Sequence, residues 1–403
     1  MPILFQINTS VNSCSHGRIA EEIGKLAIEQ GWESYIAYGR VKRPSVSHTI
    51  KVGTNWDIRW HGLETRLFDR HGLASKKATK DLIVQIEKIQ PNIIHLHNIH
   101  GYYLNIEILF DYLAKANIPI VWTLHDCWGL TGHCSNFDFI GCEKWKTQCY
   151  SCPQIREYPA SYFIDRSTKN YFLKKKFFTS VKNLSIIPVS NWLKNIVKFS
   201  FLAEYPIQVI NNGIDTHLFT PMNGNAMRQK LGLINSFVLL GVANVWGSRK
   251  GLDDFLQLSR ELSNNCKIVL VGLSNKQLNK LPSNIIGIAR TENVGQLAEL
   301  YSIADLFINP TWEDNFPTSN LEALACGTPV LTYNTGGSIE AITPEIGFVV
   351  EQGDINGILN AVNIVKEKGK TYYSNACRER AVKFYNNEDR YQEYIDLYNK
   401  IKN

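Results

Sequence analysis

The sequence predicts an α/β protein of two domains, each built on a parallel β-sheet. The chain has 403 residues, which is too long for one ordinary hydrophobic core. Short apolar runs alternate with helix-like stretches, the order that is typical of parallel sheets with crossover helices. This alternation starts again at residue 237, so we place the domain boundary near residues 215–235. We expect domains at 1–215 and 216–385, and a final helix at 386–403 that packs back toward the first domain.

The first domain opens with a strand, a loop, a helix and a second strand. The apolar run ILFQI at 3–7 precedes a polar loop, and a helix expected at 19–30 ends at Gly31 before a strand at 35–39. This order describes a right-handed βαβ unit. The remaining strands are expected at 92–98, 118–126, 183–190 and 206–213, and the remaining helices at 81–90 and 103–117.

The second domain repeats the alternation. Its strands read as short apolar runs, which is typical of strands buried on both faces of a parallel sheet. They are predicted at 237–244, 267–272, 305–310, 329–333 and 347–350, and the helices at 253–262, 294–304, 321–327 and 354–367, followed by a helical tail.

Composition and charge narrow the class of protein. Apolar residues make up 44% of the chain and charged residues 20%, as in soluble globular proteins. The N-terminus does not resemble a signal peptide, and no apolar run approaches the roughly 20 residues that cross a bilayer, so we expect a cytoplasmic protein. The net charge is +9 over residues 1–200 and −3 over residues 201–403. This asymmetry indicates either an anionic partner of the first half or simply a basic surface, and it is too diffuse for a nucleic-acid site.

The strongest motif is TWEDNFPTSNLEALACGTPV at 311–330. Here a strand ends in a loop that leads directly into a helix, which we expect Thr318 or Ser319 to cap and Gly327 to end. Because helix N-termini bind phosphates, the amides near Thr318 can hold a diphosphate. Glu322 lies one turn into the helix, where its carboxylate can accept from ribose hydroxyls. Taken alone, the motif fits equally well an acidic loop followed by a glutamate that the helix dipole favours.

This stretch resembles the signature of the family-4 retaining glycosyltransferases of GT-B fold. Their pattern has two glutamates separated by seven residues, and then an Ala-rich tail that ends in Gly-x-Pro-Val. The present chain has Asp314, seven residues, Glu322 and then ALACGTPV. The first acidic residue is therefore Asp, with Glu313 beside it. The segment EDNFPT is similar to the corresponding segment of a subgroup linked to bacterial surface-polysaccharide synthesis.

The resemblance implies a fold and a chemistry. It implies two Rossmann-like domains that face each other across a cleft, with the acceptor on the N-terminal domain and the nucleotide sugar on the C-terminal domain. It also implies retention at the anomeric carbon and no cofactor for catalysis. Glu322 would hold the ribose, and Asp314 or Glu313 would orient the sugar. Because no carboxylate is placed as a nucleophile, we expect a front-face transfer that the leaving phosphate assists.

A second motif, NVWGSRKGLDDF, places Arg249 and Lys250 before Gly251 and a helix. Two fixed cations suit a diphosphate leaving group, whose negative charge grows as the glycosidic bond breaks. By itself the motif is more typical of an exposed basic turn. The family, however, opens the first helix of its donor domain with a Lys-Gly pair. It also has an arginine about five residues earlier, where this chain has Val245, so we expect Arg249 to replace that residue in part.

Two motifs of the first domain are expected at the acceptor site. The family has a Gly-Gly pair in the first strand–helix loop, and Gly17 in SHGR is the glycine that remains there, at a position where backbone can approach a ligand closely. WTLHDCW ends a strand, and the resemblance implies that its His125 contacts the transferring sugar or the acceptor. Asp126 is expected to face the same cleft. We interpret the histidines of HLHNIH as lining of that cleft.

Four of the nine cysteines cluster in an insertion expected near 127–160. They have the spacing C-x7-C-x6-C-x2-C, with His133 beside the first, and are Cys134, Cys142, Cys149 and Cys152. Only the last pair has the spacing of a zinc knuckle. A structural zinc site and reduced thiols are the main alternatives. Disulfides rank third, because we expect no secretion signal and disulfides are rare in the cytoplasm.

A basic and aromatic stretch follows the insertion. NYFLKKKFFTSVKN at 170–183 combines three lysines, Lys174, Lys175 and Lys176, with three phenylalanines, Phe172, Phe177 and Phe178. Such a helix can lie on an anionic membrane. A helix that packs one face on the core and exposes a basic side is the alternative. The residues alone slightly favour this alternative, whereas the lipid-linked acceptors that are common in the family support the membrane, at the inner face of the plasma membrane.

These patterns predict a retaining glycosyltransferase that moves a hexosyl group from a nucleotide-diphosphate sugar to a glycan or lipid-linked saccharide in surface-polysaccharide synthesis. The alternatives are a nucleotide-sugar 2-epimerase of the same architecture and a catalytically weak nucleotide-sugar-binding protein. A zinc-dependent nucleic-acid binder would explain nothing in the second domain. The predicted catalytic residues are His125, Asp314 and Glu322. The predicted substrate-binding residues are Gly17, Asp126, Arg249, Lys250, Glu313, Asn315, Phe316, Pro317 and Thr318.

Overall fold

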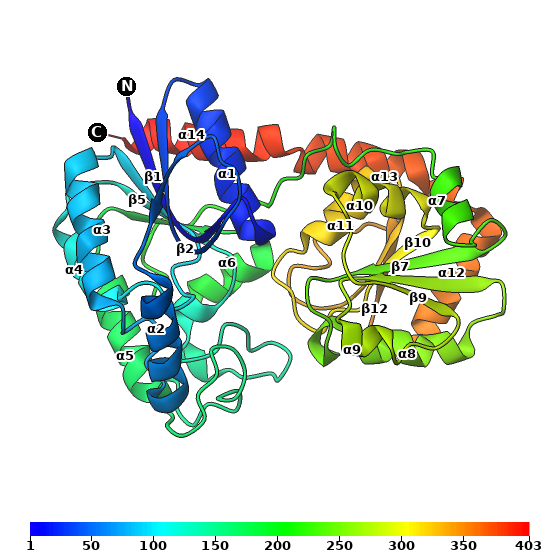
Figure 1. Cartoon of the computed structure of the whole chain (residues 1–403), viewed down its shortest axis with the longest axis horizontal. Helices are drawn as coiled ribbons and strands as arrows, with labels where there is room; N and C mark the ends of the chain where they lie inside the picture. The colour runs from blue at the N-terminus through cyan, green and yellow to red at the C-terminus, as the bar shows by residue number, and fades with distance from the viewer. Residues whose placement is uncertain (403) are drawn as a thin grey trace. The chain divides into compact units, whose positions relative to one another are not determined.

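The computed structural model describes residues 1–402, which separate into two compact units. Unit 1 contains Met1–Asn211 and the C-terminal segment from Arg390, and unit 2 contains Asn212–Asp389. Each unit has a six-stranded parallel sheet with helices packed on both faces (Figure 1). The predicted α/β architecture of two Rossmann-like domains is therefore confirmed.

Unit 1 has its strands in the order β3-β2-β1-β4-β5-β6, and every neighbouring pair is parallel. The strands are β1 (Ile3–Val11), β2 (Glu33–Lys42), β3 (His48–Lys51), β4 (Ile93–Leu96), β5 (Ile120–Leu124) and β6 (Leu184–Pro188). The helices are α1 (Cys14–Glu29), α2 (Asn55–Phe68), α3 (Lys76–Ile89), α4 (Ile106–Lys115), α5 (Ser167–Phe178), α6 (Asn191–Lys198) and most of α14 (Asn387–Ile401).

The core of unit 1 includes residues from both ends of the chain. Apolar side chains of β1, β4 and β5, such as Leu4, Ile93 and Val121, pack together with Tyr394 and Tyr398 of α14. The two tyrosines also reach polar groups inside the sheet, because Tyr398 Oη lies 2.6 Å from His95 Nδ1. The C-terminal helix is therefore part of the unit that the N-terminus begins.

Unit 2 has its strands in the order β12-β11-β10-β7-β8-β9, again all parallel. The strands are β7 (Phe237–Val242), β8 (Cys266–Val271), β9 (Ile285–Ile288), β10 (Leu306–Asn309), β11 (Val330–Tyr333) and β12 (Gly347–Val350). The helices are α7 (Asn225–Lys230), α8 (Leu252–Glu261), α9 (Asn275–Leu278), α10 (Val294–Ile303), α11 (Thr318–Ala325), α12 (Ile355–Lys368) and α13 (Lys370–Tyr385).

Both sheets have the same topological switch point. In unit 1 the order reverses between β1 and β4, and in unit 2 it reverses between β7 and β10. Ligands of open parallel sheets bind beyond the carboxyl ends of the strands at such a point. The loops after these four strands are therefore the first places to look for a site.

Some predicted elements differ from the structure. Residues 206–213 form no regular strand, although Ile207 makes an isolated parallel bridge to Ile186 of β6. Pro188, further along β6, has no N–H to donate, which prevents a regular ladder there. The first strand extends to Val11 and α1 begins at Cys14, so the predicted polar loop is reduced to two residues. The short strands β3 and β9 and the helices α2, α6, α7 and α9 were not predicted.

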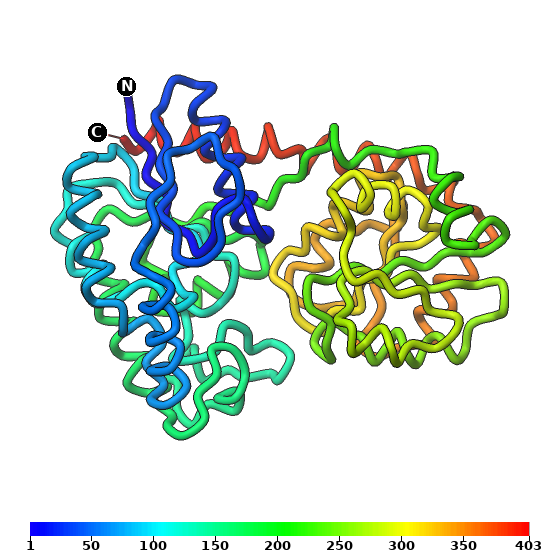
Figure 2. Tube along the Cα trace, in the orientation of Figure 1, coloured from blue at the N-terminus to red at the C-terminus, as the bar shows by residue number. Residues whose placement is uncertain are grey.

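The connection from β5 to α5 is the longest irregular segment of unit 1. Figure 2 traces residues 125–166 as a lobe of loops, with only the one-turn helices η1 (Trp128–Leu130) and η2 (Lys144–Lys146). This lobe contains the predicted cysteine cluster. Across residues 1–402, no helix is both long enough and apolar enough to span a bilayer.

Candidate active site

The loops after β7 and β10 are joined to each other at the switch point of unit 2. The backbone N–H of Trp312 donates to the carbonyl of Arg249 at 2.9 Å, and the guanidinium of Arg249 donates to the carbonyl of Glu313 at 3.2 Å. Gly251 has a φ of +73°, and a Cβ there would lie 2.1 Å from the carbonyl oxygen of Pro310. Only glycine allows this approach, so the basic motif and the acidic motif are built as one surface.

An ion pair lies at the centre of this surface. Lys250 Nζ contacts Asp314 Oδ2, and each side chain is about one-fifth exposed, at 23% and 19%. The carbonyl of Asp314 accepts from the N–H of Gly337 at 3.1 Å, and Gly336, with a φ of +50°, packs directly against that carbonyl. The structure therefore brings four predicted residues together, and it fixes Asp314 more firmly than a surface loop would.

Helix α11 begins beside the ion pair. Its first residue is Thr318, Pro317 occupies the N-cap position, and no side chain caps the first turn. The prediction that Thr318 or Ser319 caps the helix is therefore wrong, because proline has taken that position. Asn315 and Phe316 are buried just before the helix, and the carbonyl of Phe316 accepts from Asn212 Nδ2 at 3.0 Å. An uncapped helix N-terminus next to a lysine is a favourable anion site.

Glu322 lies on α11, one turn after Thr318, and its side chain is buried. Its Oε2 accepts a hydrogen bond from the hydroxyl of Tyr301 at 2.9 Å. Tyr301 comes from α10 and is fully buried, so it fixes the carboxylate. The motif does not predict this partner, because a tyrosine on the preceding helix has no signal in it.

In unit 1, a chain of hydrogen bonds runs from the sheet to His125. Gln6 Nε2 donates to the carbonyl of Ala20 at 2.8 Å, so Gln6 Oε1 is the acceptor for His97 Nε2 at 2.9 Å. His97 Nδ1 is then left to accept from His125 Nε2, at 3.3 Å. Burial lowers the pKa of His125 to about 3, so the ring is neutral at pH 7. A neutral ring that donates from Nε2 has its lone pair on Nδ1.

His16 lies beside this chain of hydrogen bonds and was not among the predicted site residues. Its ring is 6.1 Å from that of His125, and its Nδ1 lies 2.9 Å from Asn8 Oδ1. Burial lowers the pKa of His16 to about 4. Gly17 follows it inside the first turn of α1, rather than in the loop that was predicted. A Cβ on Gly17 would lie 2.7 Å from Ser10 Oγ, so the glycine lets α1 pack closely on the end of β1.

Asp126 is paired within unit 1. Its Oδ2 lies 2.6 Å from His100 Nε2, and its Oδ1 accepts from the N–H of Trp128 at 2.9 Å. Burial alone would raise the pKa of Asp126, but His100 and this N–H together lower it. His100 Nδ1 in turn lies 3.1 Å from the hydroxyl of Tyr158 in the insertion. The histidines of HLHNIH thus have different positions, because His95, within β4, is in the core under α14 and His100 joins Asp126.

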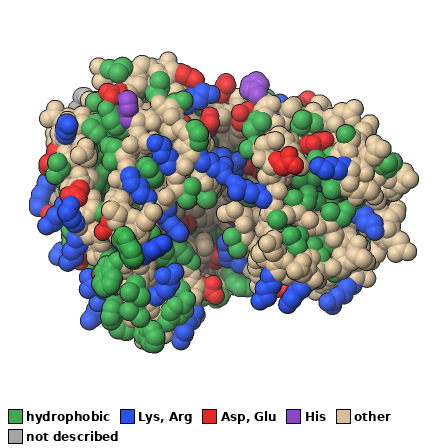
Figure 3. Space-filling model, in the orientation of Figure 1, with side chains coloured by type: hydrophobic (Ala, Val, Ile, Leu, Met, Phe, Trp, Pro, Cys, Tyr) green, Lys and Arg blue, Asp and Glu red, His purple; other side chains and the backbone are tan. Residues whose placement is uncertain are grey.

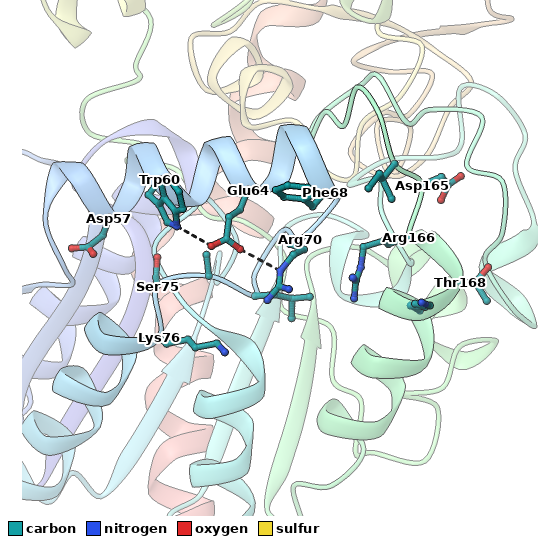
Figure 4. A pocket seen from close by; sticks show the side chains of 14 residues that line it. Asp57, Trp60, Glu64, Phe68, Arg70, Ser75, Lys76, Asp165, Arg166 and Thr168 are labelled. Atoms are coloured by element: carbon teal, nitrogen blue, oxygen red, sulfur yellow. Dashed lines mark hydrogen bonds and ion pairs between the residues drawn. The ribbon is translucent and has the colours of Figure 1, made fainter.

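A large pocket lies elsewhere in unit 1. Its volume is about 1060 Å³, and α2, the start of α3 and residues 164–169 line it (Figure 4). Glu64 is at its centre, where it accepts from Trp60 Nε1 at 2.9 Å and pairs with Arg70 Nε at 3.2 Å. No predicted site residue lines this pocket.

The predicted cysteines meet at one small cavity. All nine cysteines are free thiols, and the four of the cluster line a cavity of about 10 Å³ in the lobe. Within residues 1–402, no three His, Cys, Asp or Glu side chains are arranged to hold a metal ion. Zinc binding therefore stays a prediction.

Helix α5 packs one face on the core. Lys174 is buried, donates to the carbonyl of Trp128 at 2.6 Å, and lies 3.5 Å from the centre of that indole ring. Phe178 is fully buried as well, whereas Phe172 is exposed. The three lysines therefore do not share a membrane-facing surface, and the alternative of a core-facing helix holds for Lys174 and Phe178.

Comparison with known proteins places this geometry in context. A model described as Glycosyltransferase Family 4 matches residues 17–218, and one described as Glycosyl transferases group 1 matches residues 225–384. The chain is 24% identical to the putative colanic acid biosynthesis glycosyl transferase WcaC of Escherichia coli K12, over 99% of this chain and 100% of that protein. It is 27% identical to an Escherichia coli UDP-Gal:alpha-D-GlcNAc-diphosphoundecaprenol alpha-1,3-galactosyltransferase, over 58% of this chain and 64% of that one.

Solved structures are similar in fold. Sucrose-phosphate synthase from Thermosynechococcus elongatus has a TM-score of 0.75 at 16% identity, and covers 100% of this chain and 99% of its own. Anabaena Alr3699/HepE in complex with UDP has a TM-score of 0.70 at 15% identity, and covers 99% of this chain and 100% of its own. At these identities the likeness extends to the fold alone.

Proposed function

The chain belongs to glycosyltransferase family 4, and from this premise we propose that it transfers a hexosyl group from a nucleoside diphosphate sugar to a saccharide acceptor with retention at the anomeric carbon. The observation that carries the proposal is the ion pair of Lys250 and Asp314 beside the uncapped N-terminus of α11. It lies at the switch point of a parallel sheet, where such folds bind nucleotides.

The donor diphosphate would bind between Lys250 and the first amides of α11. Because Lys250 is already paired with Asp314, a diphosphate that takes the lysine would release the aspartate. Asp314 could then orient the sugar hydroxyls, with Glu313 next to it. Lys250, the α11 amides and Arg249 would stabilise the negative charge that grows on the leaving phosphate. Glu322, already fixed by Tyr301, would hold the ribose.

The acceptor side would use neutral groups. His125 is a neutral ring just after β5, and a neutral imidazole can hydrogen-bond a sugar hydroxyl without introducing a charge. The proton of the attacking hydroxyl would pass to the leaving phosphate on the same face of the sugar. This front-face route needs neither a carboxylate nucleophile nor a cofactor.

We extend the proposal to the acceptor itself. One relative is named for colanic acid biosynthesis and another for a diphosphoundecaprenol-linked substrate. We therefore propose a lipid-linked saccharide of a surface polysaccharide as the acceptor.

An exposed aromatic and basic surface of unit 1 supports that acceptor class. The outer side of α2 and the nearby loop expose Trp56, Trp60 and Phe163 at 75%, 61% and 77%. Arg59 and Arg66 lie on the same helix, and Figure 3 shows apolar side chains gathered with Lys and Arg in this part of unit 1. Exposed tryptophans mixed with arginines suit the interface of an anionic bilayer. We propose that this surface, rather than α5, rests on the cytoplasmic leaflet.

A transfer assay resolved by mass tests the function. The protein would be given UDP-, GDP-, ADP- and dTDP-sugars, with and without glycan and lipid-linked acceptors. We expect one nucleotide to be released only with an acceptor, and that acceptor to gain the mass of one hexose with retained configuration. An epimerised nucleotide sugar formed without any acceptor would instead identify an epimerase. Tight binding of a nucleotide sugar with no product across the panel would identify a binding protein.

A further inference from the structure

The lobe between β5 and α5 encloses a cavity that the proposed transfer does not use. Its walls include the side chains of Cys134, Cys142, Cys149 and Cys152. A cavity of about 10 Å³ has room for roughly one water-sized occupant. Four sulfur atoms around a space for one small occupant are unusual in a lobe with almost no regular secondary structure.

Donors are already directed at these sulfur atoms. The N–H of Gly132 donates to Cys149 Sγ at 3.2 Å, and the N–H of Gln154 donates to the sulfur of Cys152. Cys134 also donates its S–H to Cys152. The sulfur atoms of the cluster are therefore within reach of one another and of backbone donors at one cavity.

His133 lines the same cavity and provides an independent observation. Its Nδ1–H donates to Asp69 Oδ1 at 2.6 Å, and both side chains are fully buried. Asp69 Oδ2 is itself held by the N–H of Arg166 at 2.7 Å. The other ring nitrogen, Nε2, is buried with no hydrogen-bond partner among the described residues. A rigid imidazole with an unsatisfied nitrogen at the cavity indicates a missing polar group or ion.

Lys174 adds a buried positive charge beside the thiols. A buried ammonium normally has an anionic partner, but its direct contacts are the carbonyl and the ring of Trp128. Burial lowers the pKa of Lys174 to about 7, and the nearby Cys149 and Cys134 act against this shift. A zinc ion bound by four thiolates has a net charge of about −2, which a buried lysine would partly balance.

We propose that Cys134, Cys142, Cys149 and Cys152 bind one Zn²⁺ as a tetrahedral thiolate site, with His133 and Lys174 as its hydrogen-bonding and charge-balancing partners. An all-sulfur set of ligands selects zinc over magnesium, calcium or manganese. The four side chains line one cavity, but no three of them are placed to hold a metal ion as they stand, so binding requires their sulfur atoms to converge. The site is structural, because all four ligand positions are taken by protein.

The zinc site would also position a residue of the candidate active site. Tyr158 follows the last ligand by six positions, and its hydroxyl lies 3.1 Å from His100, which pairs with Asp126. Zinc would therefore order the lobe that holds Tyr158 in place. The zinc proposal does not depend on the sugar transfer, because metal content is measured without any substrate.

Metal analysis of the full chain tests the proposal. The protein would be produced in zinc-supplemented medium, purified without chelators and examined by mass spectrometry for zinc and iron. We expect about one zinc per chain in the wild type and in Cys14→Ser, which changes an exposed cysteine outside the lobe. The double variant Cys149→Ser/Cys152→Ser should lose it. Zinc in the wild type no higher than in the double variant, or stoichiometric iron in place of zinc, would overturn the proposal.

Cobalt provides a second measurement that does not depend on variants folding. Reduced, metal-free wild-type protein would be titrated with Co²⁺ and then with Zn²⁺. We expect the intense visible and near-ultraviolet bands of tetrahedral cobalt thiolate, and their loss when zinc displaces cobalt. His133→Gln should keep these bands but release metal to a chelator faster. Spectra of octahedral cobalt in the wild type would contradict a thiolate site.

Discussion

The two switch points have the same strand order and opposite chemistry. In unit 2 the switch point has formal charges, with Lys250 paired to Asp314 beside a helix N-terminus. In unit 1 it has a chain of neutral groups that runs from Gln6 through His97 to His125. A charged surface suits an anionic diphosphate, whereas neutral donors and acceptors suit hydroxyl groups. The comparison indicates that one topology can provide both halves of a sugar transfer through the side chains that follow its strands.

Acid should destabilise unit 1 much more than unit 2, and this is the largest effect that we expect. Burial lowers the pKa of six histidines, which all lie in unit 1: His16, His61, His71, His95, His97 and His125. Unit 2 contains only His217. Each of the six is neutral when folded but protonated below about pH 6.5 when unfolded. Its contribution to stability is therefore lost as the pH falls from 6.5 toward 4, by up to about 1.4 kcal/mol per pH unit for each histidine.

Hydrogen exchange read by mass spectrometry, corrected for the intrinsic effect of pH, would follow the two units separately. Peptides of unit 1 should lose protection between pH 6.5 and 5, while peptides of unit 2 keep theirs. Equal loss in both units would contradict the assignment of neutral histidines to the core of unit 1.

Removal of the positive charge of Lys250 in unit 2 should have the next largest effect, on the rate of transfer. Lys250→Met should lower kcat of transfer by about 10²–10³, because a cation that stabilises the leaving phosphate is lost. Lys276→Ala, which removes an exposed lysine of α9, is the matched control and should be near wild type. Initial rates at saturating donor would provide the comparison. Equal rates for Lys250→Met and the control would remove Lys250 from the site.

Substitution of His125, on the neutral switch point of unit 1, should lower the transfer rate less. His125→Ala should lower kcat/KM for the acceptor by about 10-fold, which is the loss of one neutral hydrogen bond, and leave the KM of the donor unchanged. Because the pKa of His125 is about 3, the wild-type rate should show no ionisation of this residue between pH 5 and 8. If His125→Ala raised only the KM of the donor, His125 would contact the donor, and its assignment to the acceptor would be wrong.

The smallest effect concerns the surface on α2. Trp56→Ser with Trp60→Ser should weaken binding to anionic vesicles by about 10-fold, because two exposed aromatic anchors are lost. Transfer to a soluble acceptor should be unchanged. Flotation with anionic and with neutral vesicles would measure this, and Phe172→Ser on α5 is the control. Unchanged flotation of the tryptophan variant would exclude this surface.

The sequence predicted the residues that lie close together in the chain better than those that meet in space. The spacing of Asp314 and Glu322, and the Arg-Lys-Gly turn, led directly to unit 2. The pairing of Lys250 with Asp314 was out of reach, since 64 residues separate them and parallel strands bring them together only through the fold. Tyr301 and His16 were missed for a related reason, because a single polar residue on a helix has no periodic signal.

The structure separates the three lysines of α5 and corrects the cap predicted at Thr318, in both cases for local reasons. Consecutive residues of a helix point about 100° apart, so three lysines in a row cannot share one face. Lys174 turns inward because Trp128, from a distant segment, offers both a carbonyl and an aromatic ring. Thr318 does not cap α11 because Pro317 takes the N-cap position. In each case a neighbouring residue decided the outcome, Trp128 for Lys174 and Pro317 for Thr318, and the local sequence pattern does not take that residue into account.

The most direct test is the binding of UDP to three proteins, measured by calorimetry: the wild type, Lys250→Met and His125→Ala. If the charged switch point of unit 2 binds the diphosphate, Lys250→Met should weaken UDP binding by about 10-fold or more, and His125→Ala should bind as the wild type does. If UDP binds equally to the wild type and Lys250→Met, or if only His125→Ala weakens it, the assignment of donor chemistry to unit 2 is contradicted.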